Sequence, residues 1–328
     1  DPRMRALDGT LIYGTTTGLI GNDGLALVEL MGRLDARFAA DVRIAKTFID
    51  QAASIPGQSY ELLLDGLRRT VLGNGITPTP FNDGTTSVSR NPFYVNISEL
   101  GGNAVFQALS GKVSIRSSAN LVPALARTDF SVFLSLRYLT PFVLQTSDSA
   151  AISLLKGAHE ELAQAWQADQ TNRAAGSTDL IYSDEYLADR AAFLTWKNKL
   201  AVEDADASTT AYNKGGATDQ WFRDNASNLT LNLGSGAAPA DKRRFIFGGE
   251  GADTISGGSQ SGRLYGGGGV DHLYGYDGHD HLEGGAGNDE LHGGDQDDVL
   301  VGGADDDRLE GGRGFDTYIV GQGTDADA

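Results

Sequence analysis

Apolar positions in the first 205 residues recur at helical spacing. One predicted helical face consists of Leu27, Leu30, Met31, Leu34, Phe38, Val42, Ala45 and Ile49, which are three or four residues apart, and Pro56 ends that element. Similar spacing predicts helices over residues 59–72, 98–109, 121–139, 149–168 and 184–201. Residues 73–90 contain Asn-Gly, Thr-Pro and Asn-Asp-Gly turns, which favour a loop. We therefore expect a mainly helical domain over residues 1–205.

Polar and glycine-rich residues then lead into short alternating segments. Residues 228–233 alternate polar and apolar side chains, and residues 244–247 read Arg-Phe-Ile-Phe, so both are predicted strands. We expect residues 206–247 to be a linker with capping strands, because a stacked fold needs an atypical terminal unit. The strand at residues 244–247 is predicted to be the first of the cap.

From Gly248 the pattern has a period of nine, in eight uninterrupted nonamers that end at Ile319 and leave residues 320–328 as a tail. Position six is Asp253, Asp271, Asp280, Asp289, Asp298, Asp307 and Asp316, with Gly262 in the second nonamer. Position eight is Ile255, Leu264, Leu273, Leu282, Leu291, Leu300, Leu309 and Tyr318. We predict short strands with the middle residue inward and two nonamers per coil, so that repeats n and n+2 share a side. The fold class is α + β, with a parallel β-roll after the helical domain.

Charge is concentrated in the same segment. Residues 248–328 hold 14 Asp, 4 Glu and 3 Arg, a net −15 of the chain's −18. Carboxylates stacked about 4.8 Å apart repel one another unless a divalent cation lies between them. Ca²⁺ takes six or more oxygens, which glycine turns with free carbonyls and an Asp can supply. We therefore expect a calcium-binding segment that is unfolded without the ion.

The expected ligands come from the turns. They are the seven position-six Asp residues together with Gly248, Gly251, Gly266, Gly269, Gly284 and Gly287. Glycine at positions one, two and four is expected to allow positive φ and to let backbone carbonyls crowd a cation, which a Cβ would obstruct. Pairing repeats n and n+2 gives five good sites and a weaker sixth, because Gly262 and Gln260 replace Asp and Gly in the second repeat. The flanking His272, Glu283 and Arg308 are expected in solvent. So are the four histidines of the segment, which show no transition-metal pattern.

Composition excludes several functions. A strongly acidic chain argues against nucleic acid or an anionic membrane as the main partner. The absence of Cys excludes disulfides and thiolate sites, and no apolar run is long enough to span a bilayer. The sequence opens at Asp1-Pro2 without Met, which suggests a piece of a longer chain.

No motif in the chain predicts catalysis. GxSxG, HExxH and phosphate-loop patterns are missing, and no carboxylate pair stands out. His159 lies in the apolar stripe of Ile152, Leu155, Leu162 and Trp166, which favours a core or boundary histidine over a catalytic base. We expect no catalytic residue and no organic cofactor in this chain.

The blocks GGAGNDELHGG and GGRGFDTYIVG resemble the repeats of RTX proteins that Gram-negative bacteria export by type I secretion. Residues 135–144, 185–197 and 243–255 also look like the segment that joins an α/β-hydrolase module to the roll in large secreted RTX lipases and esterases. The resemblance implies a secreted protein that meets the type I machinery and folds outside the cell in calcium. Because GxSxG is missing, it implies lipase activity for a longer parent only.

Three functions are compatible with these patterns. The first is a non-catalytic, calcium-triggered folding and secretion segment. The second is part of a secreted RTX hydrolase, with its active site upstream or within residues 1–245, which ester or glycoside turnover assays would reveal. The third is an adhesin or toxin module, which calcium-dependent binding to cells or liposomes would reveal. Oligomeric state and target are not encoded in any motif.

Overall fold

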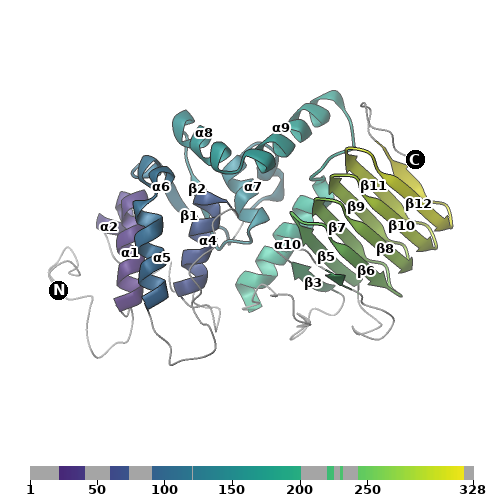
Figure 1. The fold of residues 1–328 in the computed structure, drawn as a ribbon, viewed down its shortest axis with the longest axis horizontal. Coiled ribbons are helices and arrows are strands. Elements are labelled where there is room, and N and C mark those ends of the chain that lie inside the picture. Colours follow the sequence, from purple (N-terminus) through teal and green to yellow (C-terminus); the bar gives the residue numbers. More distant parts are fainter. Residues whose placement is uncertain are drawn as a thin grey trace. The chain divides into compact units, whose positions relative to one another are not determined.

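The computed structural model describes residues 22–40, 60–73, 91–119, 121–200, 220–224, 230–231 and 243–320. Internal contacts divide the chain into two compact units (Figure 1). The helical unit contains Asp1–Ala163 and Arg190–Val202, and the roll unit contains Gln164–Asp189 and Glu203–Ala328. Residues 164–189, which belong to the predicted helical segment in sequence, are thus grouped with the roll.

Most of the described helical unit is α-helix. Its elements are α1 (Asn22–Leu34), α2 (Ala36–Ala40), α4 (Tyr60–Leu72), α5 (Asn91–Gly102), α6 (Ala104–Leu109), η2 (Pro123–Arg127), α7 (Phe130–Arg137) and α8 (Ser149–Ala158). Two further helices, α9 (Glu160–Ala175) and α10 (Asp184–Leu200), each contain residues of both units. Leu27, Leu64, Phe106 and Leu134 are fully buried, so the helices share an apolar core.

Four of the predicted helices are interrupted by local capping. The first breaks at Asp35, which separates α1 from α2 and accepts a hydrogen bond from the Arg37 amide at 3.0 Å. Asn103 separates α5 from α6, because its side chain accepts a hydrogen bond from the Val105 amide at 2.8 Å. The segment 121–139 divides into η2, which begins at Pro123, and α7, which Asp129 caps. His159 ends α8 and separates it from α9. The helix predicted over 59–72 is confirmed, whereas Val42, Ala45, Ile49, Pro56 and residues 74–90 lie outside the described residues.

A two-stranded antiparallel sheet in the helical unit was not predicted. Strand β1 (Ser114–Ser117) pairs with β2 (Phe142–Gln145), with Ile115 opposite Leu144. Both strands are four residues long, which is too short for a period of two to stand out. Across the described helices, none is long and apolar enough to cross a bilayer.

The roll consists of two parallel sheets (Figure 1). One sheet contains the strands of the even-numbered nonamers and two cap strands, in the order β13 (Thr317–Ile319), β11 (Val299–Ala304), β9 (His281–Ala286), β7 (Arg263–Gly268), then the cap strands β5 (Arg243–Gly249) and β3 (Gln220–Asp224). The other contains the strands of the odd-numbered nonamers and one cap strand, in the order β12 (Arg308–Arg313), β10 (Glu290–Asp295), β8 (His272–Asp277), β6 (Thr254–Gly258), then the cap strand β4 (Thr230–Leu231). Each strand pairs with the strand two nonamers away, which confirms the coil of two nonamers.

The cap differs from its prediction in one respect. A strand does form at residues 244–247, within β5, but it is preceded by β3, and β4 extends the second sheet by pairing with β6. The prediction that residues 244–247 form the first cap strand is therefore wrong. Residues 220–224 do not alternate clearly between apolar and polar side chains, so their pattern does not predict a strand. The strand is recognised only from its parallel pairing with β5.

A single file of aliphatic side chains fills the roll. Ile246, Ile255, Leu264, Leu273, Leu282, Leu291 and Leu300 are completely buried, and Leu309 packs on the end of this file. Tyr318 in the last repeat is exposed, because no further coil covers it in the described residues. Burying one leucine contributes about 1.5–3 kcal/mol, whereas ordering the backbone costs about 1 kcal/mol or more for every residue. The roll therefore needs a stabilising interaction besides its core.

Candidate metal centre

Glycines of the turns have two different structural roles. From the third repeat onward, positions two and four adopt positive φ, as at Gly267 (112°) and Gly269 (114°), and glycine tolerates this region without strain. Position one does not, and the expectation of positive φ there is wrong. A side chain on Gly284 would instead collide with the Oδ2 of Asp289 and with the carbonyl oxygen of Gly302. Glycine at position one thus keeps space open between oxygens.

The position-six aspartates form two rows along the roll. The odd row contains Asp253, Asp271, Asp289 and Asp307, and the even row contains Asp280, Asp298 and Asp316. Within each row an aspartate amide donates to the Oδ1 of the aspartate two repeats later, as from Asp271 to Asp289 at 2.8 Å. One oxygen of each accepting carboxylate is therefore held by the backbone. The same-side pairing predicted for these residues is present.

The second carboxylate oxygen is buried without a hydrogen-bond donor at four of these residues. In the described structure no donor reaches the Oδ2 atoms of Asp271, Asp280, Asp289 and Asp298. Burial, together with the neighbouring carboxylates, raises the pKa of Asp289 to about 8 and that of Asp271 to about 7, although the backbone hydrogen bonds oppose this. Burial likewise raises the pKa of Asp280 to about 7 and of Asp298 to about 6. An ionised carboxylate here requires a nearby cation.

The surroundings of these oxygens fit a hard cation. Two oxygens lie close to the place that a Cβ would occupy on a position-one glycine. One is an aspartate Oδ2, and the other is the carbonyl oxygen of position one in the next coil of that side. This arrangement recurs at Gly266, Gly275, Gly284 and Gly293. In the described residues no three His, Asp or Glu side chains are grouped to hold one ion. The donor set is therefore carboxylate and carbonyl oxygen, which suits Ca²⁺ and does not suit Zn²⁺ or Cu²⁺.

Comparison with known families agrees with this chemistry. Residues 245–264, 257–291 and 283–318 match the family of the RTX calcium-binding nonapeptide repeat. The roll is an RTX calcium-binding segment. Among curated proteins and solved structures, no significant match to the chain was found. The RTX repeats thus cover residues 245–318, and the family match does not extend to the helical unit.

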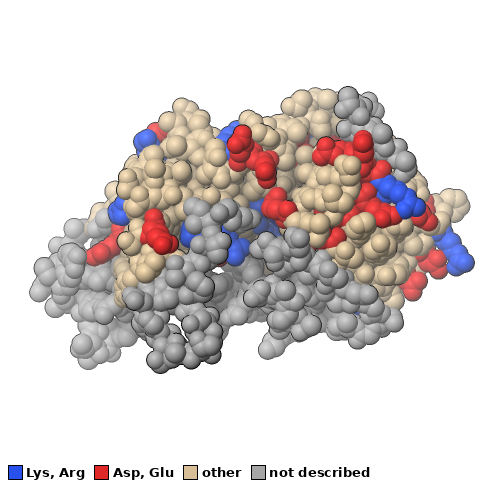
Figure 2. Space-filling view, viewed as in Figure 1, with Lys and Arg blue, Asp and Glu red and all other residues tan. Residues whose placement is uncertain are grey.

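The RTX segment also carries acidic side chains at its surface. Figure 2 shows acidic side chains over the roll strands, interspersed with a few basic ones. Some are paired in ladders, as where Glu290 lies 3.0 Å from His272 and 3.1 Å from His292. Arg308 is exposed as predicted, and these histidines are partly exposed. They pair with surface glutamates and lie apart from the aspartate rows.

Glu283 contradicts its prediction as a solvent-facing residue. Only 2% of its side chain is exposed, and its Oε1 accepts hydrogen bonds from Ser183 Oγ (2.5 Å) and His281 Nε2 (2.6 Å). Its Oε2 is buried and accepts none from the described residues. A segment distant in sequence covers this face of the even sheet.

Residues 164–189 make the cover, and their contacts involve positions seven and nine of the even repeats. The Tyr186 ring packs edge-on against Phe247 and Tyr265, which stack on each other at 4.9 Å. Asp189 accepts hydrogen bonds from Tyr265 Oη at 2.5 Å and Arg263 at 3.0 Å. Position nine of the even repeats is Tyr265, Glu283, Val301 and Ile319, against Ser256, Tyr274, His292 and Glu310 in the odd repeats. Position nine is thus more apolar in the even repeats, and this is the sequence signal that could have indicated a covered face on the even sheet.

His159 is a buried core residue, as its apolar stripe predicts. Its Nε2 lies 2.9 Å from the Thr70 carbonyl oxygen, which can only accept, so Nε2 carries the proton. Nδ1 of the neutral ring then accepts from the Tyr138 hydroxyl at 3.0 Å. Burial lowers the pKa of His159, with the Thr70 contact opposing it. Both ring nitrogens are engaged in the core.

Proposed function

We propose that this chain is a calcium-triggered folding segment of an exported protein, with no catalytic role of its own. About five Ca²⁺ ions bind between same-side turns, three along the odd row and two along the even row. The ligands are the position-six aspartates together with backbone carbonyl oxygens of the turns. Calcium supplies the positive charge that lets the buried carboxylates remain ionised in a folded roll.

The observation that carries this proposal is the set of buried Oδ2 atoms, each facing a position-one carbonyl. Such oxygens destabilise a metal-free roll, because burying an unpaired carboxylate costs several kcal/mol. In the unfolded chain the same groups are hydrated and separated. The folded state is therefore favoured only where calcium is abundant, which supports a protein that crosses an envelope unfolded and folds outside the cell.

Calcium titration of the full chain tests the proposal. We expect strand circular dichroism to develop cooperatively with Ca²⁺ and not with equal Mg²⁺, since Mg²⁺ demands near-octahedral geometry. Calorimetry should count about five ions. A roll that is already folded in a chelator, or that binds no Ca²⁺, would contradict the proposal. Export is tested separately, by following the chain into the medium of cells with and without a type I machinery.

A further inference from the structure

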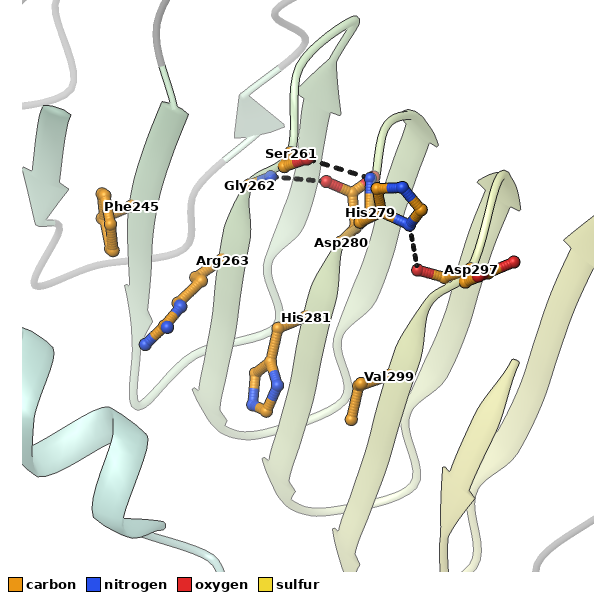
Figure 3. A pocket seen from close by; sticks show the side chains of 9 residues that line it. All are labelled: Phe245, Ser261, Gly262, Arg263, His279, Asp280, His281, Asp297 and Val299. Atoms are coloured by element: carbon orange, nitrogen blue, oxygen red, sulfur yellow. Dashed lines mark hydrogen bonds between the residues drawn. The ribbon is translucent and has the colours of Figure 1, made fainter. Parts of the chain in front are cut away.

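The second repeat interrupts the even row, and an arginine is present at the interruption. Gly262 stands where the other repeats have Asp, and its amide donates to Asp280 Oδ1 at 2.6 Å (Figure 3). Phe245 in β5 pairs with Arg263 in β7, so Arg244 is level with Gly262 and occupies the position-six place of the coil before it. Arg244 is 2% exposed. Its charge is therefore buried within the roll.

The Arg244 guanidinium contacts the same type of oxygen that the aspartate rows face elsewhere. Its Nη1 donates a hydrogen bond to the carbonyl oxygen of Gly257, which is position one of the second repeat. A side chain on Gly258 would collide with this guanidinium, whereas at Gly267 and Gly285 the corresponding collision would be with a carbonyl. The absence of a side chain at Gly258 thus leaves room for the Arg244 guanidinium.

The electrostatics are consistent with this placement. The Arg244 charge lowers the pKa of the Asp280 carboxyl, against the larger effect of burial that raises it. The reciprocal attraction acts on Arg244, whose pKa burial lowers and Asp280 raises. The two groups are therefore close enough for their opposite charges to attract each other.

We propose that the Arg244 guanidinium is a built-in cation that takes the place of Ca²⁺ at the N-terminal end of the even row. Calcium sites on this side then begin with Asp280 and Asp298, and the weak sixth site around Gly262 takes no ion. The arginine offers fixed positive charge to position-one carbonyl oxygen and to Asp280 at any calcium concentration. This inference rests on the calcium-binding function proposed for the roll.

Restoring the missing aspartate, with and without the arginine, tests the inference in the full chain. Gly262 does not have a positive φ, and a methyl group there would lie 3.4 Å from the nearest atoms, so Gly262→Asp is sterically tolerable. We expect calorimetry and native mass spectrometry to count the same number of Ca²⁺ ions in the wild type, Arg244→Gln and Gly262→Asp. In Gly262→Asp the new carboxylate pairs with Arg244. The double variant Arg244→Gln/Gly262→Asp should bind one additional ion.

Two control variants test whether the effect depends on a positive charge at position 244. One keeps a cation at that position, and the other removes an arginine elsewhere in the roll. Arg244→Lys/Gly262→Asp keeps a cation and should gain no ion. Arg308→Gln/Gly262→Asp removes an arginine that is 62% exposed on β12, and should also gain none.

An additional ion in Gly262→Asp alone would overturn the inference. So would a double variant, Arg244→Gln/Gly262→Asp, that binds no additional ion or stays unfolded at saturating Ca²⁺, because calcium should replace the guanidinium there. A wild type that binds no Ca²⁺ would instead overturn the proposed function. The two failures are therefore distinguishable.

Discussion

The helical unit buries apolar side chains from several helices against one another, whereas the roll buries one apolar residue for each nonamer beside a row of carboxylates. Leu27, Leu64, Phe106 and Leu134 come from α1, α4, α6 and α7 and are fully buried. In the roll, Leu282 and Leu291 are equally buried, yet Asp280 and Asp289 lie beside them and are buried too. We therefore expect the helical core to be stable without an ion and the roll to depend on one.

Calcium removal should separate the two units most strongly. We expect the chelated chain to lose the roll strands and the docked residues 164–189, because the aromatic and polar contacts of that segment are with β5, β7 and β9. The helices α4, α6 and α7 should remain. Hydrogen exchange measured by mass spectrometry checks this, with protection of α7 amides unchanged and protection of β8–β11 lost. Joint loss of protection in α7 and β9 would show one cooperative unit instead of two.

Within the roll, an interior carboxylate should matter more than a terminal one. Asp289 is buried between Asp271 and Asp307, whereas Asp316 ends the even row and is half-buried. Asp289→Asn preserves an oxygen for the Asp271 amide and removes one charge from two proposed sites. We expect it to raise the Ca²⁺ midpoint of folding about tenfold, roughly 1.4 kcal/mol, and to lower cooperativity.

Asp316→Asn should shift the same midpoint less, and Asp295→Asn should hardly shift it. Asp295 is an exposed control whose carboxylate lies 3.5 Å from the guanidinium of Arg313. All variants are titrated at one ionic strength, because screening alone moves every midpoint. Equal midpoints for Asp289→Asn and Asp316→Asn would exclude shared ligands.

The docked segment should contribute a smaller amount. Ser183→Ala removes a donor from the buried Glu283 carboxylate, so we expect a loss of about 1–3 kcal/mol in the unfolding of the roll at saturating Ca²⁺. Ser153→Ala is the matched control, because its hydroxyl is exposed and bonds only within α8. Denaturant unfolding followed by tyrosine fluorescence measures both. A Ser183→Ala roll as stable as the Ser153→Ala roll would show that the segment does not hold Glu283 in solution.

The smallest effect expected is that of pH on the calcium midpoint. Raised pKa values belong to the folded, metal-free roll, whose stability falls as pH rises from about 4 to about 8, since it binds more protons than the unfolded chain there. If the metal-free roll is unfolded, its aspartates are already ionised at pH 6, and the midpoint should be nearly equal at pH 6 and pH 8. If the metal-free roll is instead folded, Ca²⁺ must displace protons from its carboxylates. The calcium midpoint should then rise about tenfold for each unit by which the pH falls, for each proton displaced.

Much of the roll was readable from the sequence because its contacts repeat at a fixed interval. The period of nine predicts which residues face inward, which aspartates share a side and how many nonamers make a coil. For position-one glycine, the prediction of positive φ was wrong, whereas the prediction that a Cβ would obstruct backbone carbonyl oxygens agrees with the structure. The helical unit was predicted less well, because caps such as Asn103 and Asp129 decide where its helices break.

The sequence by itself determined the alternation of turns and strands, the two rows of aspartates and the calcium chemistry, because these depend on residues at fixed spacing. Tertiary structure decided what covers Glu283, that β3 precedes β5 in the cap, and where the Arg244 head lies. Each of these depends on a contact between segments separated in sequence, and neither residue type nor period specifies such a contact. For Arg244, packing places the buried guanidinium beside the carbonyl oxygen of Gly257, which accepts its hydrogen bond.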